Sequence, residues 1–157
     1  MNPSPAPRRQ RILIADDSPA IRECLSKLLE QADYEVQQAA NGQEALEQLA
    51  EARFDLMLLD LNMPELDGWG TLERIRLQHP ALPVVVITAQ PNQQDWMQRL
   101  GAVALLEKPL DLPLLFQTLS ELKHRSPHGH RRPLRYVRPW RNPALSAQPV
   151  RTSPINE

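Results

Sequence analysis

The sequence predicts an α/β protein built on a parallel β-sheet, and two observations carry this prediction. Short runs of consecutive apolar residues lack the alternation of a half-exposed strand, and the clearest are residues 12–15, 56–59 and 84–87. Such runs are typical of strands that helices cover on both faces, as in parallel sheets. Segments with apolar residues at helical spacing separate these runs, which gives the alternation of strand and helix expected for such a fold.

The first predicted helix follows the strand at residues 12–15. Ser18 is suited to cap it, because its side-chain oxygen can accept an N–H of the first turn. The apolar residues at helical spacing are Ile21, Cys24, Leu25, Leu28 and Leu29. Cys24 lies on this stripe, so we expect a buried and unreactive thiol. The next strand, residues 34–39, is shorter and more polar, which suits an edge of the sheet.

Three later helices have their own start and stop signals. Asn41 and Glu44 have the spacing of a capping box, which predicts a helix after Asn41. Asp67 is suited to cap a helix from about residue 69 to residue 78, which His79-Pro80 ends. Asp111 is suited to cap the last helix, whose inward-facing residues are Leu112, Leu115, Phe116, Leu119 and Leu122.

The predicted apolar strands share a second property, since polar residues follow them directly. Asp60 follows the run at residues 56–59, and Pro64 and Gly68 then direct the chain into a loop. Asp16 and Asp17 follow the run at residues 12–15, and Thr88 follows the run at residues 84–87. Lys108 follows a further predicted strand, which is short and covers residues 105–107. In an open parallel sheet the carboxyl ends of the strands meet at one edge, where binding sites form. We therefore expect three carboxylates, a hydroxyl and an ammonium at this edge.

This set of side chains indicates a metal site beside a phosphoryl site. Three crowded carboxylates repel one another unless a cation lies among them, and ligand sets made only of oxygen suit Mg²⁺. A lysine and a hydroxyl beside them are suited to hold the oxygens of a phosphoryl group.

The order of these motifs resembles the receiver domain of two-component response regulators, over about residues 10–123. The motifs that carry the resemblance are Asp-Asp at 16–17, Asp-x-x-Met-Pro-x-x-Asp-Gly at 60–68, Thr-Ala at 88–89 and Gly-Ala-x-x-x-Leu-x-Lys-Pro at 101–109. The resemblance implies a flavodoxin-like, doubly wound (βα)5 fold. Its five-stranded parallel sheet would have the strand order 2-1-3-4-5.

The resemblance also implies a phosphoacceptor and a metal site. Asp60 matches the phosphoacceptor of the family, which takes a phosphoryl group from a histidine kinase or a phosphotransfer protein. Asp17 matches a direct Mg²⁺ ligand, and Asp16 matches an acid that holds the metal through water. Asp60 and the backbone carbonyl of Asn62 complete the implied ligand set. The protein would catalyse its own phosphorylation and dephosphorylation and would otherwise not be an enzyme.

Further roles follow from the same resemblance. Thr88 and Lys108 match the residues that contact the phosphoryl group, and the Lys108–Pro109 peptide matches a position where the peptide bond is cis. Asn62 and Gln90 flank the expected path of the hydrolytic water. Neither side chain is a base or a bulky blocking group, so we expect hydrolysis of moderate rate.

Two departures from the family pattern bear on signalling. Leu105 stands where the family usually has a tyrosine or phenylalanine that turns inward when the threonine moves, so the usual switch is not expected here. The segment from Thr88 to Lys108 is about two residues shorter than the resemblance suggests. It predicts a short fourth helix, at about residues 93–100, and an altered output face.

The first 122 residues and the remaining 35 differ in net charge. Residues 1–122 carry 10 Lys+Arg and 18 Asp+Glu, which gives a net charge of −8. Residues 123–157 carry 8 Lys+Arg and 1 Asp+Glu, which gives a net charge of +7. Prolines and arginines without an apolar period fill the sequence after Arg125, which is typical of disorder. We therefore predict a disordered arm at 1–9, a receiver domain at 10–123 and a basic, Pro-rich, disordered tail at 124–157.

The sequence also bears on location. No apolar run approaches the roughly 18 residues that a membrane-spanning helix needs. The Pro-rich start has no apolar segment and does not resemble a signal peptide. A single cysteine excludes an intrachain disulfide. We expect a cytoplasmic protein.

Three functions are compatible with parts of this sequence. The preferred one is a phosphoacceptor that signals to an unknown downstream protein through protein–protein contacts. The second is an aspartyl-phosphate hydrolase of the haloacid-dehalogenase kind, but that chemistry needs a second acid two residues after the nucleophile, where Asn62 stands. The third is a regulator whose tail binds nucleic acid, with arginines interleaved with Tyr136 and Trp140. A solvated tail, or one that lies against its own acidic domain, is favoured over this third reading.

Overall fold

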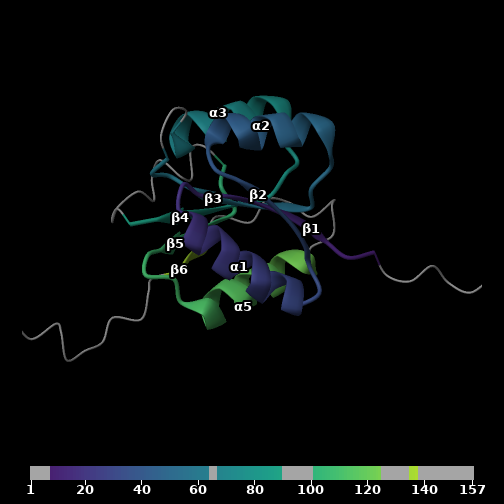
Figure 1. Ribbon diagram of the computed structural model, residues 1–157, viewed down its shortest axis with the longest axis vertical. Helices are drawn as coiled ribbons and strands as arrows, with labels where there is room; N and C mark the ends of the chain where they lie inside the picture. The colour runs from purple at the N-terminus through teal and green to yellow at the C-terminus, as the bar shows by residue number, and fades with distance from the viewer. Residues whose placement is uncertain (1–7, 64–66, 90–100, 125–134, 138–157) are drawn as a thin grey trace, which may run out of the picture.

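In the residues that the structure describes, a parallel sheet lies between two pairs of helices (Figure 1). The computed structural model describes residues 8–63, 67–89, 101–124 and 135–137. The strands are β1 Arg11–Ala15, β2 Glu35–Ala39, β3 Leu56–Asp60, β4 Val84–Thr88, β5 Ala104–Glu107 and β6 Arg135–Val137. The helices are α1 Pro19–Gln31, α2 Gly42–Glu51, α3 Gly68–Gln78 and α5 Leu112–Lys123.

The strand order is β2-β1-β3-β4-β5-β6, and every pair of neighbours is parallel. The predicted order 2-1-3-4-5 is therefore confirmed for the first five strands, and β2 lies at the edge that its polar sequence indicated. The sixth strand was not predicted. It comes from residues 124–157, for which we predicted disorder, and it pairs with the outer side of β5. The domain boundaries at residues 9 and 123 stay a prediction.

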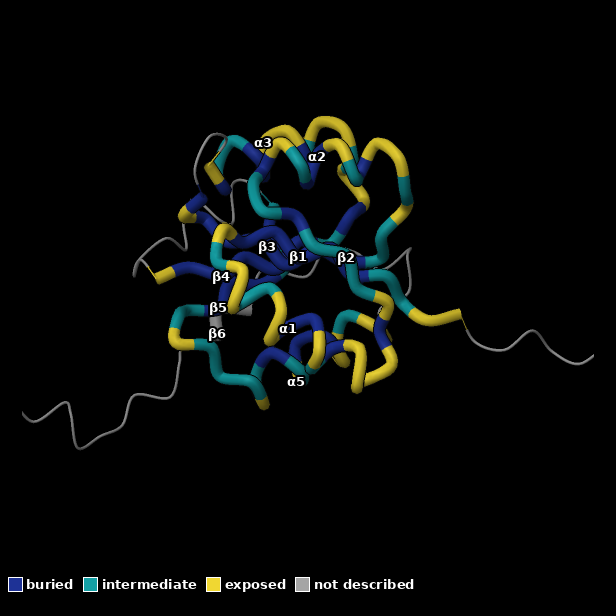
Figure 2. Tube along the Cα trace, in the orientation of Figure 1, coloured by how far each residue is buried: buried dark blue, intermediate teal, exposed yellow. Residues whose placement is uncertain are grey.

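Burial explains why the central strands have continuous apolar sequences. All five residues of β3 and of β4 are buried, since α2 and α3 cover one face of the sheet and α1 and α5 cover the other (Figures 1 and 2). A strand that is covered on both faces has no solvent-facing side chain and needs no polar alternation. The exposed residues lie mainly on the outer faces of the helices (Figure 2).

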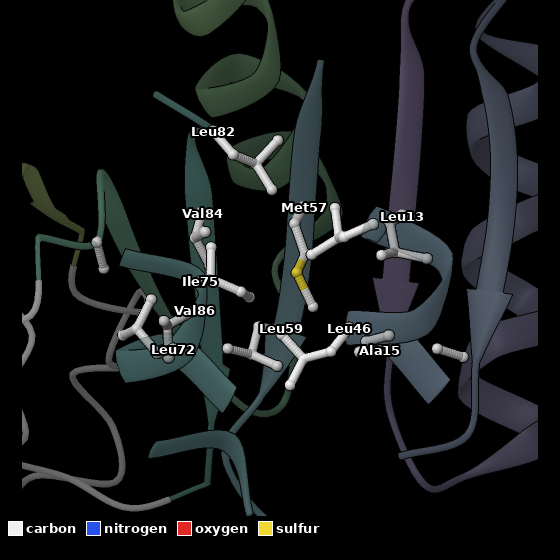
Figure 3. Packing of buried hydrophobic residues seen from close by; sticks show 14 of the residues in the cluster. Leu13, Ala15, Leu46, Met57, Leu59, Leu72, Ile75, Leu82, Val84 and Val86 are labelled. Atoms are coloured by element: carbon white, nitrogen blue, oxygen red, sulfur yellow. The ribbon is translucent and has the colours of Figure 1, made fainter. Parts of the chain in front are cut away.

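Two hydrophobic clusters fill the space between the sheet and its helices. The first cluster contains Met57 and Leu59 of β3, together with Leu46 of α2 and Leu72 and Ile75 of α3 (Figure 3). In the second, the alternate residues of the same strands meet α1 and α5, and its members include Ile14, Leu25, Leu29, Leu58, Val85 and Leu115. Alternation within each strand thus supplies both cores.

The predicted helix caps are confirmed. The Ser18 side chain accepts from the Ile21 N–H, and the Asp111 side chain accepts from the Leu114 N–H at 3.0 Å. The other two caps are Asn41, which accepts from the Glu44 N–H at 2.8 Å, and Asp67, which accepts from the Gly70 N–H at 2.8 Å. The Glu44 side chain accepts from the N–H of Ala40, one residue before the cap, whereas a capping box uses the N–H of the cap residue itself.

The prediction of a buried thiol at Cys24 is wrong, because this residue is exposed. The buried side of α1 is centred on Leu25 and Leu29. Cys24 precedes Leu25 by one position, about 100° around the helix, and so faces away from the sheet. The helix predicted at residues 93–100 lies outside the described residues. Within the described part of the chain, none of the helices combines the length and the hydropathy that crossing a membrane requires.

Candidate functional site

The strand register places two carboxylates side by side at the carboxyl edge of the sheet. Ala15 at the end of β1 pairs with Leu59 of β3, so Asp16 and Asp60 are the next residues of two neighbouring strands. Both aspartates are 2% exposed. Buried carboxylates need hydrogen bonds or opposite charges, and both have them here.

Lys108 supplies the opposite charge. Its Nζ atom lies 3.3 Å from Oδ2 of Asp16 and 3.4 Å from Oδ2 of Asp60. The main chain holds it there, because the Lys108 N–H donates to the Thr88 carbonyl at 2.8 Å, which continues the alignment of β5 with β4. The Lys108–Pro109 peptide bond is cis, as predicted.

Asp17 completes an acidic cluster that suits a divalent cation. One carboxylate oxygen from each of Asp16, Asp17 and Asp60 lies within 4.8 Å of the others, with Asp17 exposed and the other two buried. When the three acids are ionised, the one ammonium of Lys108 leaves an excess of two negative charges. An all-oxygen donor set with this excess charge fits Mg²⁺.

The electrostatics of Asp60 show how a cation would affect this carboxyl. Burial is the largest influence on this carboxyl and raises its pKa, and the neighbouring charge of Asp16 raises the pKa further. The N–H of Asn62, which donates to Oδ1 of Asp60 at 3.2 Å, and the ammonium of Lys108 both lower the pKa, but the net shift is upward. Additional positive charge at the site would therefore favour the ionised carboxylate.

Hydrogen bonds fix the loop that carries Asp16 and Asp17. The Asp16 carboxylate accepts from the Ser18 N–H at 2.8 Å, and the Asp16 N–H donates to the Ala39 carbonyl at 3.2 Å. Nη1 of Arg22 donates to the Asp16 carbonyl at 2.6 Å. Arg22 was not singled out in the sequence. The available signal was a basic residue in the first turn of a helix that begins beside two acids.

Gly68 shapes the other side of the site. A Cβ atom at this position would lie 2.4 Å from the Asp60 carbonyl oxygen and 2.4 Å from the Leu61 Cα atom. The Gly68 N–H donates to the Leu61 carbonyl at 3.1 Å, so the start of α3 packs directly on the end of β3. The sequence indicated Gly68 only as a loop residue. Its close contact with the Asp60 backbone is visible only in the folded protein.

Two other predicted site residues contact this cluster through the main chain, since the Asn62 N–H donates to Asp60 and the Thr88 carbonyl accepts from the Lys108 N–H. Thr88 is the last residue of β4 and is fully buried, and Leu105 is 1% exposed in the hydrophobic cluster beneath α2 and α3. Asn62 is exposed in the loop after β3. Gln90 lies outside the described residues. The structure thus brings together Asp16, Asp17, Asp60 and Lys108, and it places Leu105 in the core.

Comparisons with known proteins agree with this geometry. The sequence profile of the family described as the response regulator receiver domain matches residues 12–120. The transcriptional regulatory protein ZraR of Escherichia coli K12 is 40% identical over 112 residues, which are 70% of this chain and 25% of that protein. The response regulator protein PilR of Pseudomonas aeruginosa is 37% identical over 129 residues, which are 80% of this chain and 29% of PilR.

The sensor protein EvgS of Escherichia coli K12 is 36% identical over 122 residues, 76% of this chain. This chain spans only 10% of the length of EvgS. It therefore corresponds to a small part of each of these curated relatives.

Solved structures show the same fold over the same region. The chemotaxis protein CheY4 of Vibrio cholerae superposes with a TM-score of 0.69 and 34% identity, covering 73% of this chain and 99% of CheY4. The response regulator TrrA of Thermotoga maritima, solved in complex with Mg²⁺ and BeF, has a TM-score of 0.67 and 30% identity. That match covers 72% of this chain and 98% of TrrA.

Proposed function

Because the chain belongs to the family of response regulator receiver domains, we propose that its Asp60 accepts a phosphoryl group in two-component signalling. One observation carries the assignment to Asp60. Asp60 is the buried carboxylate at the end of strand β3, within 3.4 Å of the Lys108 ammonium and beside two further acids. The donor would be the phosphohistidine of a sensor histidine kinase or of a phosphotransfer protein.

The transfer is a displacement at phosphorus. An ionised oxygen of Asp60 forms the new P–O bond as the P–N bond of the phosphohistidine breaks, and the imidazole nitrogen keeps the electron pair. The Lys108 ammonium lies beside the attacking carboxylate, where it offsets negative charge on the oxygens of the transferred group. The fixed positions of Asp60 and Lys108 supply orientation before the reaction begins.

The acidic cluster would hold Mg²⁺. Asp17 and Asp60 would supply carboxylate oxygens directly, Asp16 would hold the ion through water, and the backbone carbonyl of Asn62 is a further proposed ligand. When bound, the ion would supply positive charge at the phosphoryl oxygens. The bonds that Ser18 and Arg22 make to Asp16 orient the loop from which two of these carboxylates come.

Loss of the phosphoryl group would restore the resting state. Water attacks phosphorus of the aspartyl phosphate, which releases inorganic phosphate and regenerates the Asp60 carboxylate. Exposed Asn62, together with Gln90, would border the path of this water. The output would pass through contacts with a downstream protein, and Thr88 would respond to the phosphoryl group without an aromatic partner at Leu105. A cytoplasmic location stays a prediction from the sequence.

Radioactive acetyl phosphate with Mg²⁺ tests the role of Asp60. The wild-type chain should acquire label that hydroxylamine removes, as expected for an acyl phosphate, and Asp60→Asn should acquire none, because an amide is not a competent nucleophile. Asp33→Asn is the matched control, since Asp33 is an exposed acid with φ of 68°, a conformation that asparagine also tolerates. Label that persists in Asp60→Asn, or that disappears in Asp33→Asn, would contradict the assignment.

A further inference from the structure

The sixth strand extends the sheet beyond the five strands that the family resemblance predicted. Residues 135–137 pair in parallel with β5, with Arg135 opposite Ala104, Tyr136 opposite Leu105 and Val137 opposite Leu106. Without β6, strand β5 would be an edge strand with one row of unpaired N–H and C=O groups. Such a row is a template on which another extended segment can form hydrogen bonds.

The course of the chain explains how the tail reaches this edge in a parallel direction. A parallel neighbour requires the chain to return to the amino edge of the sheet before the new strand begins. Helix α5 makes this return. Its last residues, Leu122 and Lys123, line a cavity with Ile12 and Leu56, which lie near the amino ends of β1 and β3. Strand β6 then starts opposite Ala104, the first residue of β5.

The sequence of β6 suits this place. A tyrosine and a valine occupy two of its three positions, and aromatic and β-branched residues are favoured in strands. The surrounding segment is basic, since residues 123–157 carry a net charge of +7, and it joins a domain whose residues 1–122 carry −8. Hydrogen bonding at the β5 edge and attraction between opposite charges therefore favour the same contact.

We propose that the outer edge of β5 is a strand-docking surface, that residues 135–137 of the same chain are its resident occupant, and that phosphorylation of Asp60 tightens their hold. The last clause rests on the proposed function. Strand β5 connects Asp60 to the docked tail. Its Leu106 pairs with Val137 of the tail. Lys108, two residues after Leu106, contacts Asp60. A phosphoryl group on Asp60 adds negative charge to the acidic domain, which attracts the basic tail more strongly. By linkage, the docked tail favours the phosphorylated form to the same extent.

Amide hydrogen exchange of the full chain without a phosphodonor tests the docking. Tyr136→Pro and Val137→Pro are made separately, because N–H groups alternate along a strand and one of the two substitutions removes a donor aimed at β5. At least one variant should speed exchange of alternate amides in residues 104–107 by about tenfold. Ala147→Pro, elsewhere in the tail, should leave them at the wild-type rate.

Two outcomes would overturn the docking. Equal exchange at β5 in the wild type and in both strand variants would show that residues 135–137 do not hold the edge. Protection that rises with protein concentration would show that the strand comes from a second copy and not from the same chain.

Beryllium fluoride with Mg²⁺, a non-covalent mimic of the phosphoryl group, tests the coupling. Its addition should slow exchange at β5 in the wild type, and the strand variant that loses protection should bind it more weakly than wild type or Ala147→Pro. Equal affinities in all variants would refute the coupling. If the wild type neither binds the mimic nor takes label from acetyl phosphate, the proposed function fails, and with it the coupling. The exchange without phosphodonor still decides the docking by itself.

Discussion

At Asp60, burial and the requirements of phosphoryl transfer act in opposite senses. Burial raises the pKa of this carboxyl because the ionised form loses its hydration, but the reaction needs the ionised form. In the presence of EDTA, the Asp60 carboxyl, followed by its NMR chemical shift, should therefore titrate at a higher pH than an aspartate of ordinary pKa, near 3.9. Lys108 limits this cost by its contact with the carboxylate.

The same shift predicts how Asp60 affects stability. The folded protein binds the Asp60 proton more tightly than the unfolded chain does, so this group contributes stability below the unfolded pKa of about 3.9. That contribution is lost as the pH rises through the raised folded pKa. Asp60→Asn, which stays neutral, should thus unfold at higher urea concentration than wild type at pH 7 with EDTA. This gain in stability should vanish near pH 4. If Asp60→Asn is no more stable than wild type at pH 7, the upward direction of the Asp60 pKa shift is contradicted.

Arg22 acts on the site through the backbone of Asp16. Replacing it with methionine removes a charged hydrogen bond of 2.6 Å, so we expect a loss of about 1.5 kcal/mol in the free energy of unfolding. Because the loop that bears Asp16 and Asp17 is then less well fixed, Mg²⁺ affinity measured by calorimetry should also fall. Arg22→Lys should restore part of it, since a lysine keeps the charge but not the planar fork. Unchanged Mg²⁺ affinity in Arg22→Met would limit Arg22 to a role in folding.

At the scale of secondary-structure elements, the junction of β3 and α3 determines where Asp60 lies. Gly68→Ala would place a Cβ atom 2.4 Å from the Asp60 carbonyl oxygen, a backbone atom that cannot move without its strand. We expect a loss of roughly 1–3 kcal/mol in the free energy of unfolding and weaker labelling of Asp60, because overpacking forces the backbone apart. Leu77→Ala on the same helix is the control, since Leu77 is 79% exposed. Wild-type stability in Gly68→Ala would show that the junction opens at no cost.

At the scale of the whole molecule, the proposed Mg²⁺ site predicts that stability depends on divalent cations. A ligand that binds only the folded state raises its stability by mass action. Thermal unfolding should therefore shift upward with Mg²⁺ but not with KCl at equal ionic strength. Asp17→Ala should remove most of this shift while leaving the metal-free protein nearly as stable, because one of three crowded carboxylates is gone and Asp17 is exposed. An undiminished Mg²⁺ effect in Asp17→Ala would exclude Asp17 as a ligand.

The five-stranded sheet and the members of the site could be read from the sequence, because both depend on local patterns and on their order. Runs such as residues 84–87 are long enough to identify a strand covered on both faces. In a parallel sheet, chain order then places the residues that follow each strand at one edge. That rule places Asp16, Asp60 and Lys108 at the same edge, and the strand order implied by the family resemblance places them close enough for the contacts seen.

The features that the sequence did not reveal depend on which surfaces meet. Cys24 belongs to an apolar stripe, but only the packing of α1 decides that Leu25 and Leu29 face the sheet and that Cys24 faces solvent. Gly68 is required by a contact with the backbone of another element. Residues 135–137 are too few to form a recognisable pattern, and they become a strand because β5 offers unpaired backbone groups beside them. Local periodicity determined the elements, and contacts between residues distant in the chain decided the rest.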